Sequence, residues 1–292
     1  MLIQQLVNGL FLGSVYALFA LGYTLIFGVL DILNLAHAAI FMLGAFAALV
    51  LVGLHAPLWL AIAGGAVVGG LLGVILDRVA FWPLRRRQAG PLAPLISSIA
   101  VGMIYVSAAN GLFGPDMRRF PADVVQTRSF AIGPATVTDL QLIIVAVCIA
   151  LMLGLQFLLK RTRLGAAIRA VAENPRAAQL LGIDLEGVIA QTFFIASALG
   201  AVAGILFGLN FNAVSPQMGE SVELKGLAII ILGGMGSIPG SVLGGYLIGL
   251  SEVFSVALLS SGYRDAIVFA ILFVVLVVRP GGLLGRRTLR AA

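Results

Sequence analysis

Long apolar runs separated by short polar interruptions dominate this chain of 292 residues. A helix that crosses a membrane needs about 20 mostly apolar residues, and by that measure the pattern predicts nine helical segments. Their expected bounds are 6–28, 34–54, 58–80, 92–112, 140–159, 188–210, 224–236, 239–259 and 264–279. We therefore expect an all-α fold, a polytopic membrane helical bundle with eight or nine transmembrane segments that forms a single domain over residues 1–292.

The seventh segment differs from the others because it is short and interrupted. Gly233, Gly234 and Gly236 lie near its end, and Pro239 follows. We expect a broken or re-entrant helix here, since lipid tolerates such backbone only where protein or water covers it. These three glycines are therefore candidates for a helix break beside the substrate pathway.

Composition supports a membrane protein and excludes several other classes. Hydrophobic residues make up 61% of the chain and charged residues only 10%, whereas a soluble domain carries about 25% charged residues. The single cysteine, Cys148, excludes an intrachain disulfide and a cysteine-cluster metal site. His37 and His55 do not have the helical spacing of a metal-ligand pair. We expect no catalytic residues, no metal site and no cofactor bound by this chain.

Basic residues indicate how the chain is oriented in the membrane. Most of the 18 basic residues fall in loop 84–91, in loop 160–187 and in the C-terminal tail, which includes Arg279, Arg286, Arg287 and Arg290. Cytoplasmic loops are enriched in lysine and arginine. We therefore expect these three regions and the C-terminus on the cytoplasmic side. With nine crossings the N-terminus lies outside, and if one early segment does not cross it lies inside.

The long loop 113–138 is then extracytoplasmic. It is too polar to span a membrane and contains Pro115, Pro121, Gly133 and Pro134, which favour turns. It is either a connector or a docking surface for an external partner.

The cytoplasmic loop 160–187 contains a short helix with marked ends. Asn174 is a good N-cap, Pro175 suits the first helical position, and Gly182 is a natural stop. Residues 175–181 make about two turns, roughly 10 Å. Such a helix is not stable alone in water, so it must rest on its own membrane domain or on a partner.

Glycines recur at four-residue spacing along three predicted helices. The ladders are Gly65, Gly69 and Gly73, then Gly200, Gly204 and Gly208, then Gly236, Gly240 and Gly244. Small residues on one face let membrane helices approach closely. The pattern indicates a dense bundle.

Two groups of polar residues interrupt the apolar segments. Asp31, Asn34 and His37 form either a cytoplasmic turn in which Asn34 caps the following helix, or a break that lines the substrate path. Glu220, Glu223, Lys225 and Glu252 form the second group. Glu252 lies near the outer end of its segment, where snorkelling to the interface explains it.

The chain lacks the nucleotide-binding P-loop. That motif requires Gly-Lys followed by Ser or Thr, whereas Lys160 precedes Arg161 and Lys225 precedes Gly226. This chain therefore does not bind ATP through that motif, and if its transport is powered by ATP, the nucleotide binds to another subunit.

The segment RAAQLLG, Arg176 to Gly182, resembles the Glu-Ala-Ala-x-x-x-Gly coupling motif of ABC importer permeases. Arg176 replaces the usual acid, and Glu173 lies one turn earlier. The resemblance implies that Ala177, Ala178, Leu181 and Gly182 contact an ATPase subunit. It places Glu173 and Arg176 at the polar rim of this contact.

Three longer stretches extend the resemblance to nearly the whole chain. They are LVNGLFLGSVYALFALGYTLIFGVLDILNLAHAAIFMLGAF, RAVAENPRAAQLLGID and LGGMGSIPGSVLGGYLIG, and they are similar to branched-chain amino acid ABC transporter permease subunits of the LivH type. The resemblance implies import of leucine, isoleucine or valine across the inner membrane. It also implies a second related permease subunit, two cytoplasmic ATPase subunits that bind ATP, and an extracytoplasmic substrate-binding protein.

Other functions remain open at this stage. The same importer class includes carriers of urea, amides and aromatic acids. An ATP-independent secondary transporter or channel is the chief competitor, but the spans show no buried ionisable pair of the kind that proton or sodium coupling uses. A membrane enzyme would need a nucleophile–base pair or a metal cluster at workable spacing, and the sequence shows neither.

Overall fold

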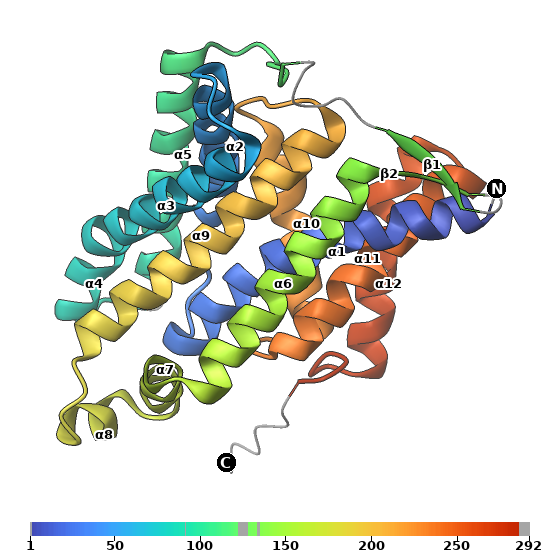
Figure 1. Ribbon diagram of the computed structural model, residues 1–292. Helices are drawn as coiled ribbons and strands as arrows, with labels where there is room; N and C mark the ends of the chain where they lie inside the picture. The colour runs from blue at the N-terminus through green and yellow to red at the C-terminus, as the bar shows by residue number, and fades with distance from the viewer. Residues whose placement is uncertain (1, 91, 122–127, 133–134, 286–292) are drawn as a thin grey trace.

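The computed structural model describes residues 2–90, 92–121, 128–132 and 135–285 as a helical bundle (Figure 1). A long helix, α1 (Leu2–Leu30), runs through its centre, with α9 (Leu185–Phe211) and α11 (Ile238–Leu258) packed along it. The other helices are α2 (His37–Gly53), α3 (Leu58–Leu76), α4 (Trp82–Arg86), α5 (Leu92–Phe113), α6 (Asp139–Arg161), α7 (Arg163–Glu173), α8 (Pro175–Leu180), α10 (Met218–Gly233) and α12 (Arg264–Val278). A π-helical turn, η1 (Asp77–Phe81), joins α3 to α4, and a 3-10 turn, η2 (Ser261–Tyr263), precedes α12.

All nine apolar segments predicted from the sequence are helices, so the expected helical bundle is confirmed. Within the described residues, seven helical stretches are long and apolar enough to cross a membrane. α2 is an apolar helix of 17 residues and α10 has 16 residues, so each is about 25 Å long. This is shorter than the hydrocarbon core of about 30 Å. The number of complete crossings remains a prediction.

Small residues bring α1 and α11 into direct contact. A Cβ atom added at Gly249 would meet the backbone of Gly13 and Gly9, and one added at Gly245 would meet Ala17. Such close approach supplies van der Waals packing where no hydrophobic effect operates between membrane helices. The packing at the centre of the bundle therefore requires small residues where α1 and α11 cross.

The predicted glycine ladders also lie at helix contacts. Gly69 and Gly73 of α3 face Ala201 and Ser197 of α9, and Gly204 of α9 faces the backbone carbonyl of Phe41. The structure thus confirms the dense packing that the spacing indicated.

A long helix followed by a short one occurs twice, in opposite directions. α1 leads into α2, and α9, which runs antiparallel to α1 in Figure 1, leads into α10. The residue after each long helix has a positive φ, 58° at Asp31 and 45° at Asn212. Each short helix then begins after a turn closed by a backbone hydrogen bond, His37 N to Asn34 O at 3.2 Å and Met218 N to Ser215 O at 3.1 Å. In element order and direction, α1–α2 and α9–α10 are therefore inverted counterparts, and we call this pair of units the inverted repeat.

The extracytoplasmic loop predicted at 113–138 contains strands that the sequence pattern did not reveal. β1 (Ser129–Ile132) pairs antiparallel with β2 (Ala135–Thr138). The Gln4 side chain fixes this hairpin to the start of α1, since its amide donates to Thr136 O at 3.0 Å and accepts from Thr136 N at 2.7 Å. The turn formers Gly133 and Pro134 lie outside the described residues.

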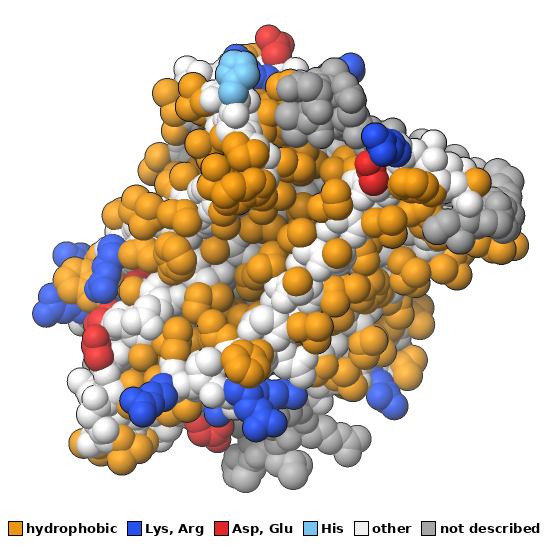
Figure 2. All heavy atoms as spheres, in the orientation of Figure 1, with side chains coloured by type: hydrophobic (Ala, Val, Ile, Leu, Met, Phe, Trp, Pro, Cys, Tyr) orange, Lys and Arg blue, Asp and Glu red, His pale blue; other side chains and the backbone are white. Residues whose placement is uncertain are grey.

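Basic side chains gather at the opposite end of the bundle. Figure 2 shows them over the end that carries α4, α7 and α8, whereas the middle of this face is mostly hydrophobic. Loops 84–91 and 160–187, which the sequence predicts on one side of the membrane, therefore lie at the same end of the bundle. Arg286, Arg287 and Arg290 lie outside the described residues.

The substitution Gly249→Ala should destabilise the purified protein by about 1–3 kcal/mol, because the added methyl group meets backbone that has no room to move. Gly154→Ala is the matched control, since nothing lies within 4 Å of its Cβ position. The measurement is the midpoint of thermal unfolding in detergent. Equal midpoints for the two variants would contradict the close α1–α11 crossing.

Candidate functional site

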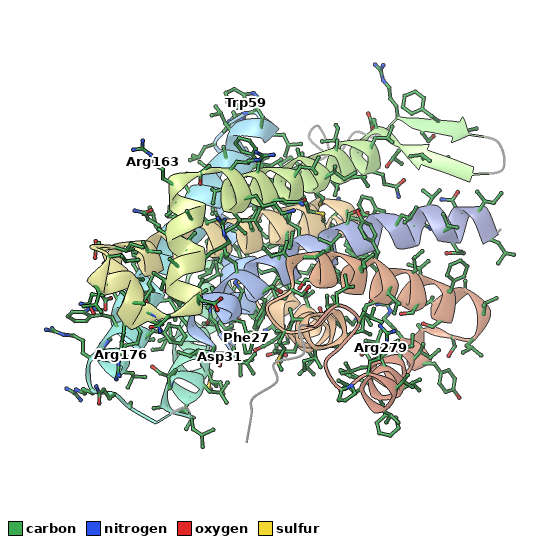
Figure 3. The ribbon with its side chains drawn as sticks, turned by 90° about the horizontal axis from the view of Figure 1, so that it is seen from below. Phe27, Asp31, Trp59, Arg163, Arg176 and Arg279 are labelled. Atoms are coloured by element: carbon green, nitrogen blue, oxygen red, sulfur yellow. The ribbon has the colours of Figure 1, made fainter. Side chains whose placement is uncertain are left out.

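The short helix predicted in the cytoplasmic loop is present as α8. The Asn174 side chain accepts a hydrogen bond from Ala177 N at 3.0 Å, Pro175 occupies the first turn, and Gly182 ends the helix with φ +80°. The helix ends one residue earlier than expected, at Leu180. Figure 3 places Arg176 and Arg163 at the end of the molecule opposite the hairpin.

α8 rests on its own chain through one residue, Ala178, which is buried with 2% of its surface exposed. The other five predicted coupling residues are exposed: Glu173, Arg176, Ala177, Leu181 and Gly182. Leu180, which was not predicted as a coupling residue, is 89% exposed, and its neighbour Leu181 is 80% exposed. Two adjacent leucine side chains are thus exposed on the surface of the loop, outside the apolar membrane-spanning segments.

A sharp corner positions α7 and α8 beneath α6. The Thr162 hydroxyl donates to Leu158 O at 2.6 Å and accepts from Gly165 N at 3.0 Å. It therefore closes the end of α6 and caps the start of α7. The absence of a side chain at Gly165 lets α7 pack against the carbonyl groups of Leu158 and Leu159.

Arg85 joins the start of α9, the helix that follows α8, to the end of α3. Arg85 forms a salt bridge to Asp77 at 2.6 Å and another to Glu186 at 3.1 Å. Asp77 is completely buried in the π-helical turn, and Glu186 lies in the first turn of α9. Arg85 therefore connects the lower end of α3 to the helix that follows α8. This connection was not predicted from the sequence, because Glu186 lies 101 residues from Arg85 along the chain.

The polar residues of the first break are partly buried and do not form a simple turn. Asn34 and His37 are completely buried, whereas Asp31 is exposed. The expected capping of α2 by Asn34 is wrong, since Ala36 is the N-cap residue and provides no side-chain hydrogen bond. The His37 ring lies 4.9 Å from the ring of Phe19 and 5.1 Å from that of Tyr23. Because both aromatic residues lie well inside α1, α2 begins deep in the bundle.

Several buried polar atoms at this break make no hydrogen bond to any described residue. They are Tyr23 Oη, both amide atoms of Asn34, and His37 Nδ1. Buried polar groups usually have a partner, so these atoms are available to water or to a polar solute.

The glycines of the predicted second break form the turn between α10 and α11. α10 ends at Gly233, and Gly234 and Gly236 have φ values of +100° and +80°. The segment after α12 packs on this turn, since Leu283 N donates to Leu232 O and Leu284 N donates to Gly233 O. These glycines therefore lie beside the C-terminal segment and do not line the pocket described next.

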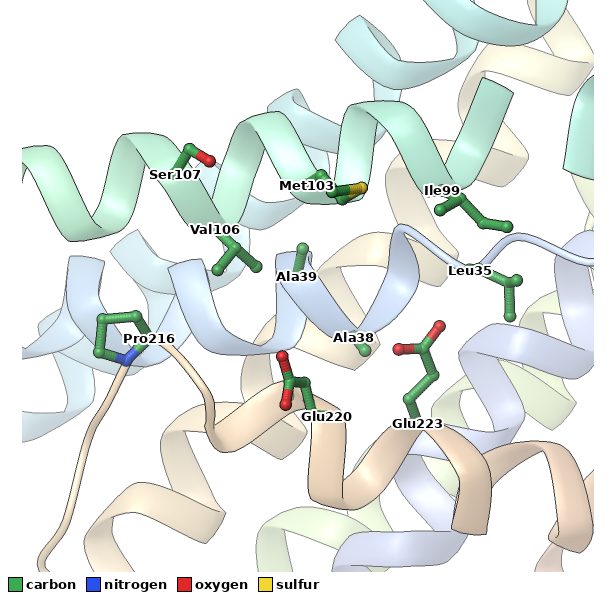
Figure 4. Close-up of a pocket in the computed structure, with 12 residues that line it drawn as sticks. Leu35, Ala38, Ala39, Ile99, Met103, Val106, Ser107, Pro216, Glu220 and Glu223 are labelled. Atoms are coloured by element: carbon green, nitrogen blue, oxygen red, sulfur yellow. The ribbon is translucent and has the colours of Figure 1, made fainter. Parts of the chain in front are cut away.

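A pocket of about 270 Å³ lies between α2, α5 and α10 (Figure 4). One wall is a helical face of α5 with Ile99, Met103 and Val106, and the opposite wall belongs to α10 with Glu220 and Glu223. Leu35, Ala38 and Ala39 at the start of α2 lie between these walls. Figure 4 shows both glutamate side chains extending from α10 toward α2. Neither carboxylate forms a salt bridge with a described residue.

The structure separates the second group of polar residues into two sets. Lys225 and Glu252 face the core with exposed fractions of 6% and 3%, and their side chains form a salt bridge of 3.0 Å. Glu252 also accepts from Tyr16 Oη at 2.8 Å and contacts Arg264 at 3.2 Å. Two expectations are therefore wrong: Glu252 does not snorkel to the interface, and the bundle does contain a buried ionisable pair. Glu252 has several partners from α1, α10 and α12, as a structural ion pair requires.

These features define a multi-pass helical membrane protein with an open pocket between α2, α5 and α10 and an exposed short helix at one end. The family model described as branched-chain amino acid transport system / permease component matches residues 5–276, and the chain belongs to this family.

Relatives of similar length support the assignment. The high-affinity branched-chain amino acid transport system permease protein BraD of Pseudomonas aeruginosa is 36% identical, over 97% of this chain and 96% of that protein. The permease protein LivH of the corresponding system of Escherichia coli K12 is 37% identical over the same shares. A probable LivH of Methanocaldococcus jannaschii is 29% identical over 93% of this chain and 89% of that protein.

The substitution Arg85→Met should lower the free energy of unfolding by about 3 kcal/mol, because it leaves the carboxylate of Asp77 buried without its partner. Arg87→Met removes a nearby exposed arginine and serves as the control. Thermal unfolding of both variants in detergent measures the difference. If Arg85→Met unfolds at the same temperature as Arg87→Met, the salt bridge to Asp77 does not support the fold.

Proposed function

We propose that this chain is a membrane-spanning permease subunit of an ATP-driven importer of the branched-chain amino acids leucine, isoleucine and valine. Family membership over residues 5–276, with relatives named for this transport across 97% of the chain, is the observation that carries the proposal. The exposed, capped helix α8 supports it, because a permease that binds no ATP through a P-loop needs a surface on which an ATPase acts.

The proposed assembly contains a second related permease subunit, two cytoplasmic ATPase subunits that bind ATP, and an extracytoplasmic substrate-binding protein. α8 binds an ATPase subunit through Leu180, Leu181 and Ala177, with Glu173 and Arg176 at the rim. Gly182 ends the helix and sets its direction. Ala178, which is buried, holds α8 against its own chain.

The mechanical connection runs from α8 into the membrane domain through α9. When ATP binding moves the ATPase subunits, α8 moves with them, and the first turn of α9 follows at once in the chain. Glu186 in this turn holds Arg85, and Arg85 holds Asp77 at the end of α3. The displacement therefore reaches both α9 and α3, and the bundle alternates between outward-open and inward-open states. The two states must differ in their contacts with the ATPase for this coupling to work.

The proposed topology follows from the inverted repeat and the basic residues. α2 and α10 each begin inside the bundle, so each combines with the connection before it, 31–36 or 212–217, to complete a crossing of the inner membrane. This gives the nine crossings predicted from the sequence. The N-terminus and the hairpin are then extracytoplasmic, and α8 and the C-terminus are cytoplasmic.

The substitution Leu180→Asp tests the proposed ATPase contact. It should abolish co-purification of the ATPase subunits, because it places a charge in an apolar contact while the residue stays exposed in the folded chain. Leu180→Met keeps the apolar side chain and should co-purify as the wild type does. ATPase activity stimulated by the loaded binding protein is measured in parallel. Unchanged co-purification and stimulation with Leu180→Asp would show that α8 is not the coupling surface.

A further inference from the structure

We propose that the pocket between α2, α5 and α10 binds the transported substrate during its passage, with Glu220 and Glu223 holding the α-ammonium group of an aliphatic amino acid. This inference rests on the proposed transport function and adds to it a substrate site in this chain.

The pocket lies where the two short helices of the inverted repeat begin. Ala38 and Ala39 belong to the first turn of α2, and Gly219 and Glu220 belong to the first turn of α10. These helix starts are in direct contact, since a Cβ atom at Gly219 would lie 2.5 Å from the Ala38 carbonyl oxygen. Transporters built from inverted repeats bind their substrates at such interfaces, where helix N-termini face anionic groups.

The start of α2 provides a place for the carboxylate of an amino acid. The first N–H groups of a helix have no partner within the helix, and Ala36 supplies no side-chain cap. Ala38 and Ala39, in this uncapped first turn, line the pocket. The partial positive charge of the helix terminus favours an anion here.

The opposite wall carries the complementary charge. Glu220 is exposed and Glu223 is half-buried, and both side chains extend toward α2 in Figure 4. Ionisable residues within membrane segments almost always face the protein interior or a water-filled cavity, and they mark substrate pathways. The carboxylates have no basic partner among the described residues. An ammonium group of the substrate supplies that missing partner.

The α5 wall and the volume of the pocket match an aliphatic side chain. Ile99, Met103 and Val106 form one face of α5, at the helical spacing of three and four residues. The volume of about 270 Å³ lies just below the range of roughly 300–1,000 Å³ for typical small-molecule pockets. A single zwitterionic amino acid with an apolar side chain therefore suits the charges, the lining and the size together.

The test compares Glu→Gln variants in the complete transporter, reconstituted in liposomes with its second membrane subunit, ATPase subunits and binding protein. The readouts are ATP-driven uptake of labelled leucine and the ATPase activity stimulated by the loaded binding protein. Glu220→Gln and Glu223→Gln should each lower uptake about tenfold or more, the effect of losing a charged hydrogen bond. Stimulated ATPase activity should stay within about twofold of the wild type. Glu223→Asp, which keeps the charge, should recover most of the uptake.

Asp116→Asn is the matched control, because it makes the same chemical change at an exposed carboxylate in the loop after α5, outside the pocket. Its stimulated ATPase activity is measured as well, so that a defect in docking of the binding protein to loop 113–138 is seen separately from a defect in uptake. Met103→Trp fills the pocket from the apolar wall and should also lower uptake.

Leucine uptake within about twofold of the wild type in both Gln variants would overturn the inference. A parallel loss of uptake and stimulated ATPase activity would also overturn it, since it would assign the glutamates a structural role. A wild-type complex that imports no leucine with ATP would instead contradict the proposed function.

Discussion

Backbone that leaves the helical conformation inside a membrane must be covered, because lipid offers no hydrogen-bond partner. This constraint organises the whole bundle. The connections 31–36 and 212–217 follow the long helices α1 and α9. Most of their residues are buried or half-buried against neighbouring elements, so little lipid reaches them. Glycines at these connections make this possible, since a Cβ atom added at Gly102 would meet Ala36 and one added at Gly208 would meet Val214. The glycines are therefore a condition for the two helix breaks, and the breaks in turn create the pocket.

The structure divides its ionisable residues between two tasks. Lys225 and Glu252 satisfy each other in the core, with Tyr16 and Arg264 as further partners. Glu220 and Glu223 lie on the same helix as Lys225 but face the pocket. Arg85 is also a paired charge, since it forms salt bridges with Asp77 and Glu186. These salt bridges join two helices, α3 and α9, that must move together in the proposed cycle. The paired charges stabilise the bundle, whereas the carboxylates of Glu220 and Glu223, which form no salt bridge with a described residue, bind the substrate in our proposal.

The sequence predicted local features well and long-range pairings poorly. Apolar runs predicted all nine major helices, and the caps Asn174 and Gly182 predicted α8, because these signals depend on neighbouring residues alone. Glu252 was misjudged for the opposite reason: its distance from the segment end suggested snorkelling, whereas its partners Tyr16 and Lys225 come from other helices. The Arg85–Glu186 salt bridge was missed on the same grounds, since 101 residues separate its partners. The hairpin is local and was missed for another reason, because its two strands have only 4 residues each. The glutamates of the pocket were noticed as polar interruptions, but only the fold shows that they face α2 and α5.

The central claim is that this chain transports only as part of an ATP-driven assembly. The most direct measurement is uptake of labelled leucine into liposomes that contain either this chain alone or the complete complex, with and without ATP on the ATPase side. We expect uptake only by the complete complex, and only with ATP and the loaded binding protein. Uptake by this chain alone in the absence of ATP would contradict the account and identify a secondary transporter or channel.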